Sequence, residues 1–77
     1  MDKYKLVIED NSPKYLQIYN HIKTMIINNE IEENKKLPPI RSIAKLLNVN
    51  NTTIVKAYEL LEKEGYVYKI IGSGTFV

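Results

Sequence analysis

The chain of 77 residues contains no cysteine and only one histidine, His21. The lack of cysteine excludes disulfide bonds and thiolate metal sites, and one histidine alone cannot build a metal site. His21 falls beside apolar positions of a predicted helix, so we interpret it as a packing or surface residue rather than a catalytic one. We therefore expect no metal and no other cofactor in this chain.

Long apolar runs are also missing. No stretch approaches the roughly 20 apolar residues of a membrane-spanning helix, and the N-terminus lacks the basic and apolar segments of a signal peptide. The sequence likewise lacks the signatures of an enzyme, such as paired carboxylates, a nucleophile with its base, or a phosphate-binding glycine pattern. We expect a cytoplasmic protein that is not an enzyme and does not bind a membrane.

What the chain does contain suffices for one small domain. Hydrophobic residues make up 44% of the sequence, which is too many for a disordered chain. Residues 1–34 carry four lysines and six acidic residues, which gives −2, whereas residues 35–77 carry seven basic and three acidic residues, which gives +4. The C-terminal part is therefore the candidate surface for an anionic partner.

The N-terminal part predicts an arm or a short strand, followed by a helix. Residues 4–8 are β-prone, so residues 1–12 are expected to form the arm or strand. Ser12 is suited to cap a helix that begins at Pro13 and continues to about Asn28. Apolar residues recur along this helix at the three- and four-residue spacing of a buried face: Tyr15, Tyr19, Ile22 and Ile26.

Two further helices follow, and only three residues separate them. Pro39 opens the second helix, and Asn48 ends it because asparagine tolerates the left-handed conformation of a C-cap. Asn50 is a suitable N-cap for the third helix, which continues to about Glu64. This helix has an apolar core face and a polar outer face: Ile54, Ala57, Tyr58 and Leu61 lie on the first, and Thr52, Lys56, Glu59 and Lys63 on the second.

A β-hairpin completes the predicted fold. Residues 66–71 and 75–77 are β-prone, and Gly72-Ser73-Gly74 between them predicts a tight turn, so that the chain ends within the second strand. Residues 30–36 are expected to be a polar connection. The sequence therefore predicts a mainly α (α+β) domain over residues 13–77, a winged helix-turn-helix with three helices and a β-hairpin wing.

The predicted third helix carries polar side chains where a recognition helix contacts DNA. Asn50, Asn51, Thr52 and Thr53 place short donors and acceptors at its positive end, suited to base edges or phosphates. Helix capping and an ordinary solvated surface are the alternative interpretation. Six tyrosines also invite a base-stacking interpretation, but Tyr15, Tyr19 and Tyr58 fall at core spacing, which leaves Tyr4, Tyr66 and Tyr68 as the predicted surface residues.

Several motifs occur together between Pro13 and Val77. They are Pro13 to Tyr19, Leu37-Pro38-Pro39-Ile40-Arg41, Ala44 to Asn50, Thr53 to Tyr58, Leu61-Glu62, Gly65-Tyr66 and Gly72 to Val77. This combination resembles the GntR family of bacterial transcription regulators. Lys56-Ala57-Tyr58 and the first of these motifs are most similar to the YtrA-type and MocR-type branches, and the choice between the two stays open.

The resemblance implies a winged helix that binds a palindromic operator in double-stranded DNA as a homodimer. It implies that the third helix lies in the major groove and the wing tip near the minor groove. For Arg41 it implies a phosphate contact, with a surface ion pair as the alternative; for the wing glycines a plain hairpin turn is the alternative. A MocR-type parent would add an aminotransferase-like domain with pyridoxal phosphate, and a YtrA-type parent a short helical dimerisation segment.

The sequence thus favours a DNA-binding domain of a transcription regulator. The candidate DNA-binding residues are Arg41, Lys45, Asn50, Asn51, Thr52, Thr53, Lys56, Gly72, Ser73 and Gly74. We expect affinity to come chiefly from phosphate contacts of the three basic residues, and specificity from Asn50, Asn51, Thr52 and the wing. A winged helix used only for protein contact is the competing hypothesis.

Overall fold

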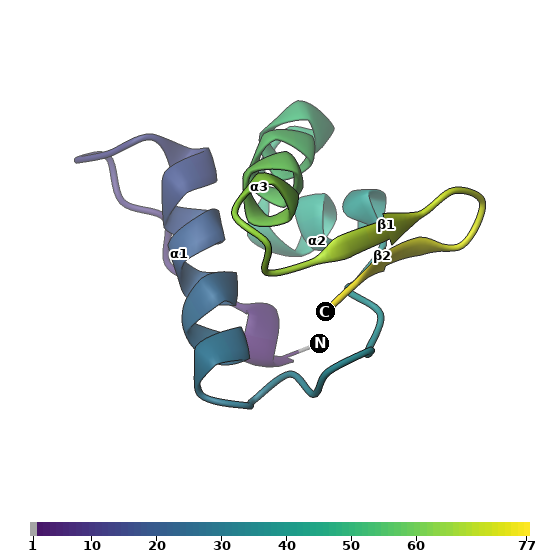
Figure 1. Ribbon diagram of the computed structural model, residues 1–77. Coiled ribbons are helices and arrows are strands. Elements are labelled where there is room, and N and C mark those ends of the chain that lie inside the picture. The colour runs from purple at the N-terminus through teal and green to yellow at the C-terminus, as the bar shows by residue number, and fades with distance from the viewer. Residues whose placement is uncertain (1) are drawn as a thin grey trace.

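Figure 1 shows the computed structural model, which describes residues 2–77. The elements follow one another as a 3₁₀ turn η1 (Asp2–Tyr4), helices α1 (Lys14–Ile27), α2 (Ile40–Leu47) and α3 (Asn51–Lys63), and strands β1 (Tyr68–Ile70) and β2 (Gly74–Phe76). Three helices followed by an antiparallel hairpin are the winged helix architecture, so the predicted fold is confirmed.

One apolar core joins the three helices. Six large side chains are almost completely buried, and they come from each helix and from the connection before α2: Ile18, Ile22, Leu37, Ile43, Ile54 and Leu61. Their spacing of four residues within α1 and of seven residues within α3 places them on one face of each helix. No polar or charged residue between positions 2 and 77 is buried. The core is therefore built from apolar residues and tyrosines, and apolar packing holds the fold.

The start of α1 differs from the prediction. Ser12 was expected to cap the helix, but Pro13 occupies the N-cap position and no side chain bonds to the first turn. Instead the side chain of Gln17 accepts from the backbone N–H of Glu9 (2.9 Å) and donates to the carbonyls of Glu9 (2.7 Å) and Ser12 (2.8 Å). A glutamine one turn into α1 thus fixes the preceding loop.

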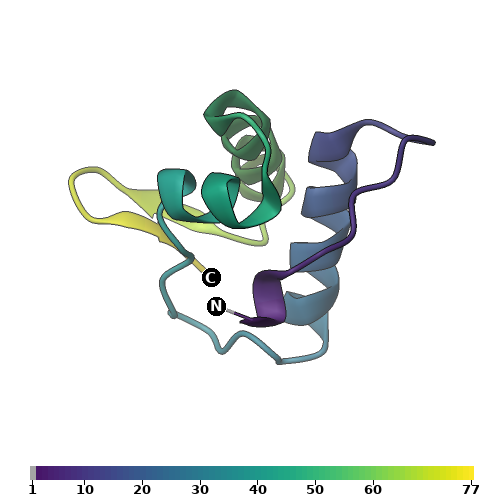
Figure 2. The same ribbon diagram turned by 180° about the vertical axis from the view of Figure 1, so that it is seen from behind.

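Residues 2–12 pack against the helical core. Tyr4 was predicted to lie on the surface, and this was wrong: its side chain is 6% exposed and belongs to the core. Residues 5–12 contain no strand; they run beside α1, as Figure 2 shows in purple, with Leu6 and Ile8 half-buried. Lys3 donates from Nζ to the Glu30 carbonyl (3.1 Å), and His21 Nε2 lies 3.1 Å from the Lys3 carbonyl oxygen, so η1 is tied to the middle of α1 and to the connection that follows this helix.

The polar connection before α2 extends the sheet. Residues 34–36 of the predicted polar connection and the following Leu37 pair with the end of the chain. The Asn34 N–H donates to the Val77 carbonyl (2.7 Å), the Val77 N–H to the Lys35 carbonyl (2.9 Å) and the Leu37 N–H to the Thr75 carbonyl (2.8 Å). A β-bridge joins Lys36 and Phe76. The wing is therefore anchored on the helical domain by backbone hydrogen bonds rather than by side chains alone.

Candidate nucleic-acid interface

The turn between α2 and α3 has the geometry of a helix-turn-helix. Asn48 adopts the left-handed conformation (φ 55°), as the sequence predicted, and caps α2. The Val49 N–H donates to the Ala44 carbonyl (3.0 Å), and α3 begins at Asn51. This tight connection sets the direction of α3 relative to α2. Figure 2 shows the two helices next to each other and the hairpin, yellow toward its tip, projecting to one side as the wing.

The first turn of α3 is open to solvent. Asn50, Asn51 and Thr52 are exposed, and Thr53 is half-buried. Asn50 occupies the N-cap position as predicted, but its side chain makes no capping hydrogen bond. Its amide is therefore available to a ligand, as are the first backbone N–H groups of the helix, which have no partner within an α-helix. This turn can donate to and accept from an external polar surface.

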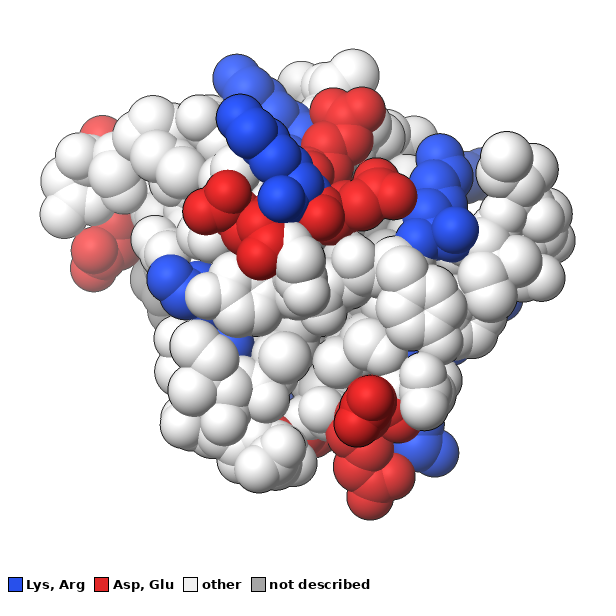
Figure 3. Space-filling model, viewed as in Figure 1, with Lys and Arg blue, Asp and Glu red and all other residues white. Residues whose placement is uncertain are grey.

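Charge divides α3 into two halves. The half that begins at Asn51 carries Lys56 and no acidic residue, whereas Glu59, Glu62 and Glu64 are exposed at the far end, together with Lys63. Figure 3 shows acidic and basic side chains interleaved over α3 on this face of the molecule. A polyanion is therefore attracted by the first half of α3 and repelled by the second.

Lys56 contacts another helix. Its Nζ atom lies 4.2 Å from the centre of the Tyr15 ring, which belongs to the first turn of α1. Tyr15 was predicted as a core residue; it is half-buried and packs against the edge of the core. Five residues from the two helix beginnings line a single shallow hollow here: Lys14, Tyr15, Thr52, Thr53 and Lys56.

The basic residues of α2 lie on its outer face. Arg41 and Lys45 are exposed and stand four residues apart, so they are neighbours on one side of the helix. The other side is the buried face, formed by Ile43, Ala44 and Leu47. The structure thus places both residues on the surface, and it brings Lys56 together with Thr52 and Thr53 at one hollow.

The local backbone conformation and packing explain why glycine occupies positions 72 and 74 of the wing. The turn begins at Ile71, one residue earlier than predicted, and closes with a hydrogen bond from the Ser73 N–H to the Ile70 carbonyl (2.9 Å). Gly72 has φ +84°, which other residues rarely adopt. Gly74 has φ +134°, and a Cβ there would lie 2.7 Å from Cε of Lys36. Close approach to DNA is therefore not needed to explain either glycine.

Tyr58 connects α3 to the segment before α2, a role that the sequence analysis missed. Its side chain is buried, and its hydroxyl donates to the Pro38 carbonyl at 2.8 Å. Burial raises the pKa of the Tyr58 hydroxyl well above its ordinary range, and the nearby Tyr4 raises this pKa further. The bond fixes α3 against the Leu37-Pro38-Pro39 segment; the pattern of apolar residues indicated burial of Tyr58 but not this partner.

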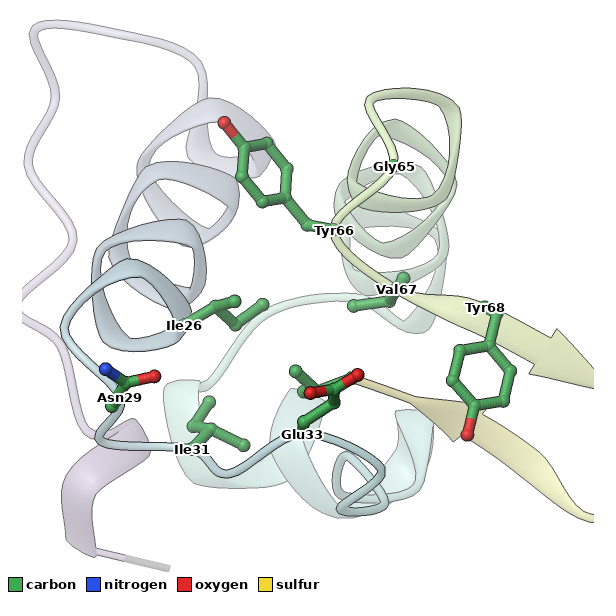
Figure 4. A pocket seen from close by; sticks show the side chains of 9 residues that line it. Ile26, Asn29, Ile31, Glu33, Gly65, Tyr66, Val67 and Tyr68 are labelled. Atoms are coloured by element: carbon green, nitrogen blue, oxygen red, sulfur yellow. The ribbon is translucent and has the colours of Figure 1, made fainter.

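The larger hollow in Figure 4 lies elsewhere, between the end of α1, the following connection and the start of the hairpin. Glu33 is the only acidic side chain among its lining residues, which also include Ile26, Ile31, Tyr66 and Tyr68. In the part of the chain that the structure describes, no group of three or more His, Cys, Asp or Glu residues could hold a metal ion. The same residues include no helix long and apolar enough to cross a membrane.

Comparison with known proteins relates the chain to bacterial transcription regulators. Residues 14–77 match the gntR family of bacterial regulatory proteins. An arabinose metabolism transcriptional repressor from Geobacillus stearothermophilus is 42% identical over 69 residues, which are 90% of this chain and 19% of the repressor. This chain therefore spans about a fifth of the length of that relative.

Solved structures agree with the sequence comparison. YtrA from Sulfolobus acidocaldarius, a GntR-family transcription factor, is 35% identical with a TM-score of 0.85, and the match covers 96% of this chain and 78% of YtrA. The DNA-binding domain of AraR in complex with operator ORX1 is 32% identical with a TM-score of 0.83, over 94% of this chain and 92% of that domain. Because the family match includes all three helices and the wing, the chain belongs to the GntR family of bacterial regulatory proteins.

Proposed function

We propose that the chain binds double-stranded DNA in a sequence-specific manner, with α3 in the major groove and the wing near the minor groove. The observation that carries this proposal is the first turn of α3, which is exposed, polar and free of carboxylates. The similar AraR domain, solved with operator DNA, supports it. The proposed DNA-binding domain spans residues 13–77, with residues 1–12 as an N-terminal arm.

Affinity and specificity are assigned to different residues in this proposal. Arg41, Lys45 and Lys56 contact backbone phosphates, which attract them irrespective of sequence. Asn50, Asn51 and Thr52 read base edges, because amide and hydroxyl groups match the donors and acceptors of the major groove. Thr53, which is half-buried, contacts the backbone beside them. Gly72, Ser73 and Gly74 bring the tip of the wing to the minor groove.

Two copies bind one operator in this proposal. A helix-turn-helix reads a short half-site, and a palindromic operator presents two half-sites related by a two-fold axis. Sedimentation of the chain with a selected operator duplex gives the stoichiometry, and we expect two chains per duplex. One chain per duplex at saturation contradicts the homodimeric arrangement but leaves DNA binding in place.

The test of DNA binding is the Arg41→Ala variant. We expect it to weaken binding to a selected operator and to an unrelated duplex by similar factors, roughly tenfold, since a hydrogen bond to a charged group contributes about 1.5 kcal/mol. Lys63→Ala removes the same charge from the acidic end of α3 and is the matched control. Affinities are measured by fluorescence anisotropy at several salt concentrations.

The competing hypothesis is a winged helix that contacts only proteins. Release of counterions from phosphates makes DNA binding fall steeply with salt, and a protein-only module lacks this dependence. If the unmodified chain shows no salt-dependent binding to any duplex, the proposed function is wrong. If Arg41→Ala loses affinity for the operator alone, Arg41 reads sequence instead of positioning the domain.

A further inference from the structure

In the described part of the chain, the contact between Lys56 and Tyr15 is the shortest between a lysine ammonium and an aromatic ring. The Lys56 Nζ atom lies 4.2 Å from the Tyr15 ring centre, whereas Lys23 lies 5.7 Å from the Tyr19 ring and 5.6 Å from the Tyr66 ring. A cation within about 6 Å of an aromatic centre is attracted by the negative ring face. The Lys56 ammonium is therefore held at a defined place between α1 and α3.

The surroundings of this ammonium suit an anion. The hollow beside it is lined by two lysines, Lys14 and Lys56, and by the hydroxyl-bearing residues Thr52 and Thr53, with Tyr15 as the remaining wall. No carboxylate lines it, so no internal anion competes for the two cations. An ammonium has three donors, and a ring on one side leaves donors that can point into the hollow.

A held lysine binds a phosphate at a lower entropic cost than a free one. Immobilising a long side chain at an interface costs about 0.5–1.5 kcal/mol, and a side chain that is ordered beforehand avoids most of this cost. Lys56 is exposed, so its four-carbon stem would otherwise sample many rotamers. The ring of Tyr15 is the feature that limits this freedom.

We propose that Tyr15 is a positioning residue, which holds the Lys56 ammonium in place for a backbone phosphate of duplex DNA. This inference rests on the proposed function, and it goes beyond it because Tyr15 itself reads no base. The alternative role of Tyr15 is structural, since it also packs against the edge of the core. A structural role affects the whole fold, whereas a positioning role acts only through Lys56.

A double-mutant cycle on Tyr15 and Lys56 separates these two roles. The probe is a short duplex of random sequence, since phosphate contacts do not depend on sequence, and affinity is measured by fluorescence anisotropy at several salt concentrations. We expect Tyr15→Leu to weaken binding about two- to tenfold, the equivalent of ordering one long side chain. Lys56→Ala is expected to reduce the slope of log affinity against log salt by about 0.9.

The decisive measurement is Tyr15→Leu in the Lys56→Ala background. There we expect no further loss of affinity, because no ammonium is left to position. Tyr15→Phe retains the aromatic face and is expected to bind like the unmodified chain. Tyr66→Leu, which removes the ring near Lys23, is the matched control and is expected to leave affinity unchanged. Thermal unfolding of each variant shows whether it is folded at the assay temperature.

Two results would overturn the inference while the unmodified chain still binds DNA. One is an equal loss from Tyr15→Leu with and without Lys56, which indicates a structural role. The other is unchanged or tighter binding by Tyr15→Leu, which means that the ring does not help Lys56 or holds it away from the phosphate. Absence of any salt-dependent binding by the unmodified chain would instead contradict the proposed function itself.

Discussion

The two halves of α3 share one buried stripe but carry opposite charge on the outside. Ile54 and Ala57 in the first half and Leu61 in the second are each fully buried. Outside, the first half presents amides, hydroxyls and Lys56, whereas the second presents three glutamates and one lysine. Packing constrains only the inner stripe, so the outer face of the same helix is free to differ along its length.

This difference indicates which part of α3 faces a polyanion. The positive end of the helix dipole coincides with the half that lacks carboxylates, and the negative end coincides with the acidic half. At each end of α3 the helix dipole and the side-chain charges act on an anion in the same direction, so the two effects add. We therefore expect substitutions in the shared buried stripe to lower stability strongly. Substitutions on the outer face should change DNA binding in a way that depends on which half of α3 carries them.

The largest effect is expected from the shared stripe itself. Leu61→Ala should lower the free energy of unfolding by about 2–5 kcal/mol, because it removes a fully buried side chain and leaves a cavity. Urea denaturation followed by circular dichroism measures it. Glu62→Ala, next in sequence and exposed, is the control and should change stability by less than about 0.5 kcal/mol. Similar losses from both variants would contradict the division into buried and outer faces.

The next effect concerns specificity in the first half. Asn51→Ala should remove discrimination at one base pair of each half-site, by about 1–3 kcal/mol, since asparagine can bond to adenine through two hydrogen bonds. Selection of binding sites from a random duplex library, with the unmodified chain and the variant in parallel, measures the change. Recovery of the same operator with the same base preferences would show that Asn51 positions the helix and that other residues read the sequence.

A smaller effect is expected where α3 is fixed to the rest of the fold. Tyr58→Phe removes the hydrogen bond to the Pro38 carbonyl and should lower the free energy of unfolding by about 1 kcal/mol. Urea denaturation at neutral pH measures this loss. Stability equal to that of the unmodified chain would mean that the bond contributes no net free energy.

The same residue predicts a dependence on alkaline pH. The raised pKa means that the folded chain keeps the Tyr58 proton after the unfolded chain, with its tyrosine pKa of about 10, has released it. The free energy of unfolding should therefore fall as the pH rises above about 10, and this fall should be shallower in Tyr58→Phe. Identical slopes in both proteins would place the alkaline titration at other groups.

The smallest effect is expected at the acidic half. Glu59→Gln should tighten binding to any duplex by less than about threefold, because exposed charges are largely screened beyond a Debye length of about 10 Å. The gain should grow as salt is lowered, which anisotropy at two salt concentrations detects. Weaker binding by this variant would mean that Glu59 contributes a favourable contact, for example by accepting from a cytosine.

Local features of the fold could be predicted from the sequence because they depend on near neighbours. Apolar spacing indicated the three helices and their buried faces, Asn48 indicated the end of α2, and the β-prone runs indicated the hairpin. The family could also be predicted, because the motifs between Pro13 and Val77 resemble those of the GntR family, and the family match over residues 14–77 confirms it. The exposure of Arg41, Lys45 and the first turn of α3 could be predicted because these residues lie on the side of their helix opposite the apolar face.

Contacts between distant residues were decided only by the tertiary structure. The sequence indicated neither the burial of Tyr4, nor the pairing of residues 34–37 with β2, nor the placement of Lys36 over Gly74. Tyr15 and Lys56 are 41 positions apart (56 − 15), and their contact exists because α1 and α3 pack side by side. Periodicity shows which face of an element is buried, but not which element covers it, because that depends on how all the elements pack together.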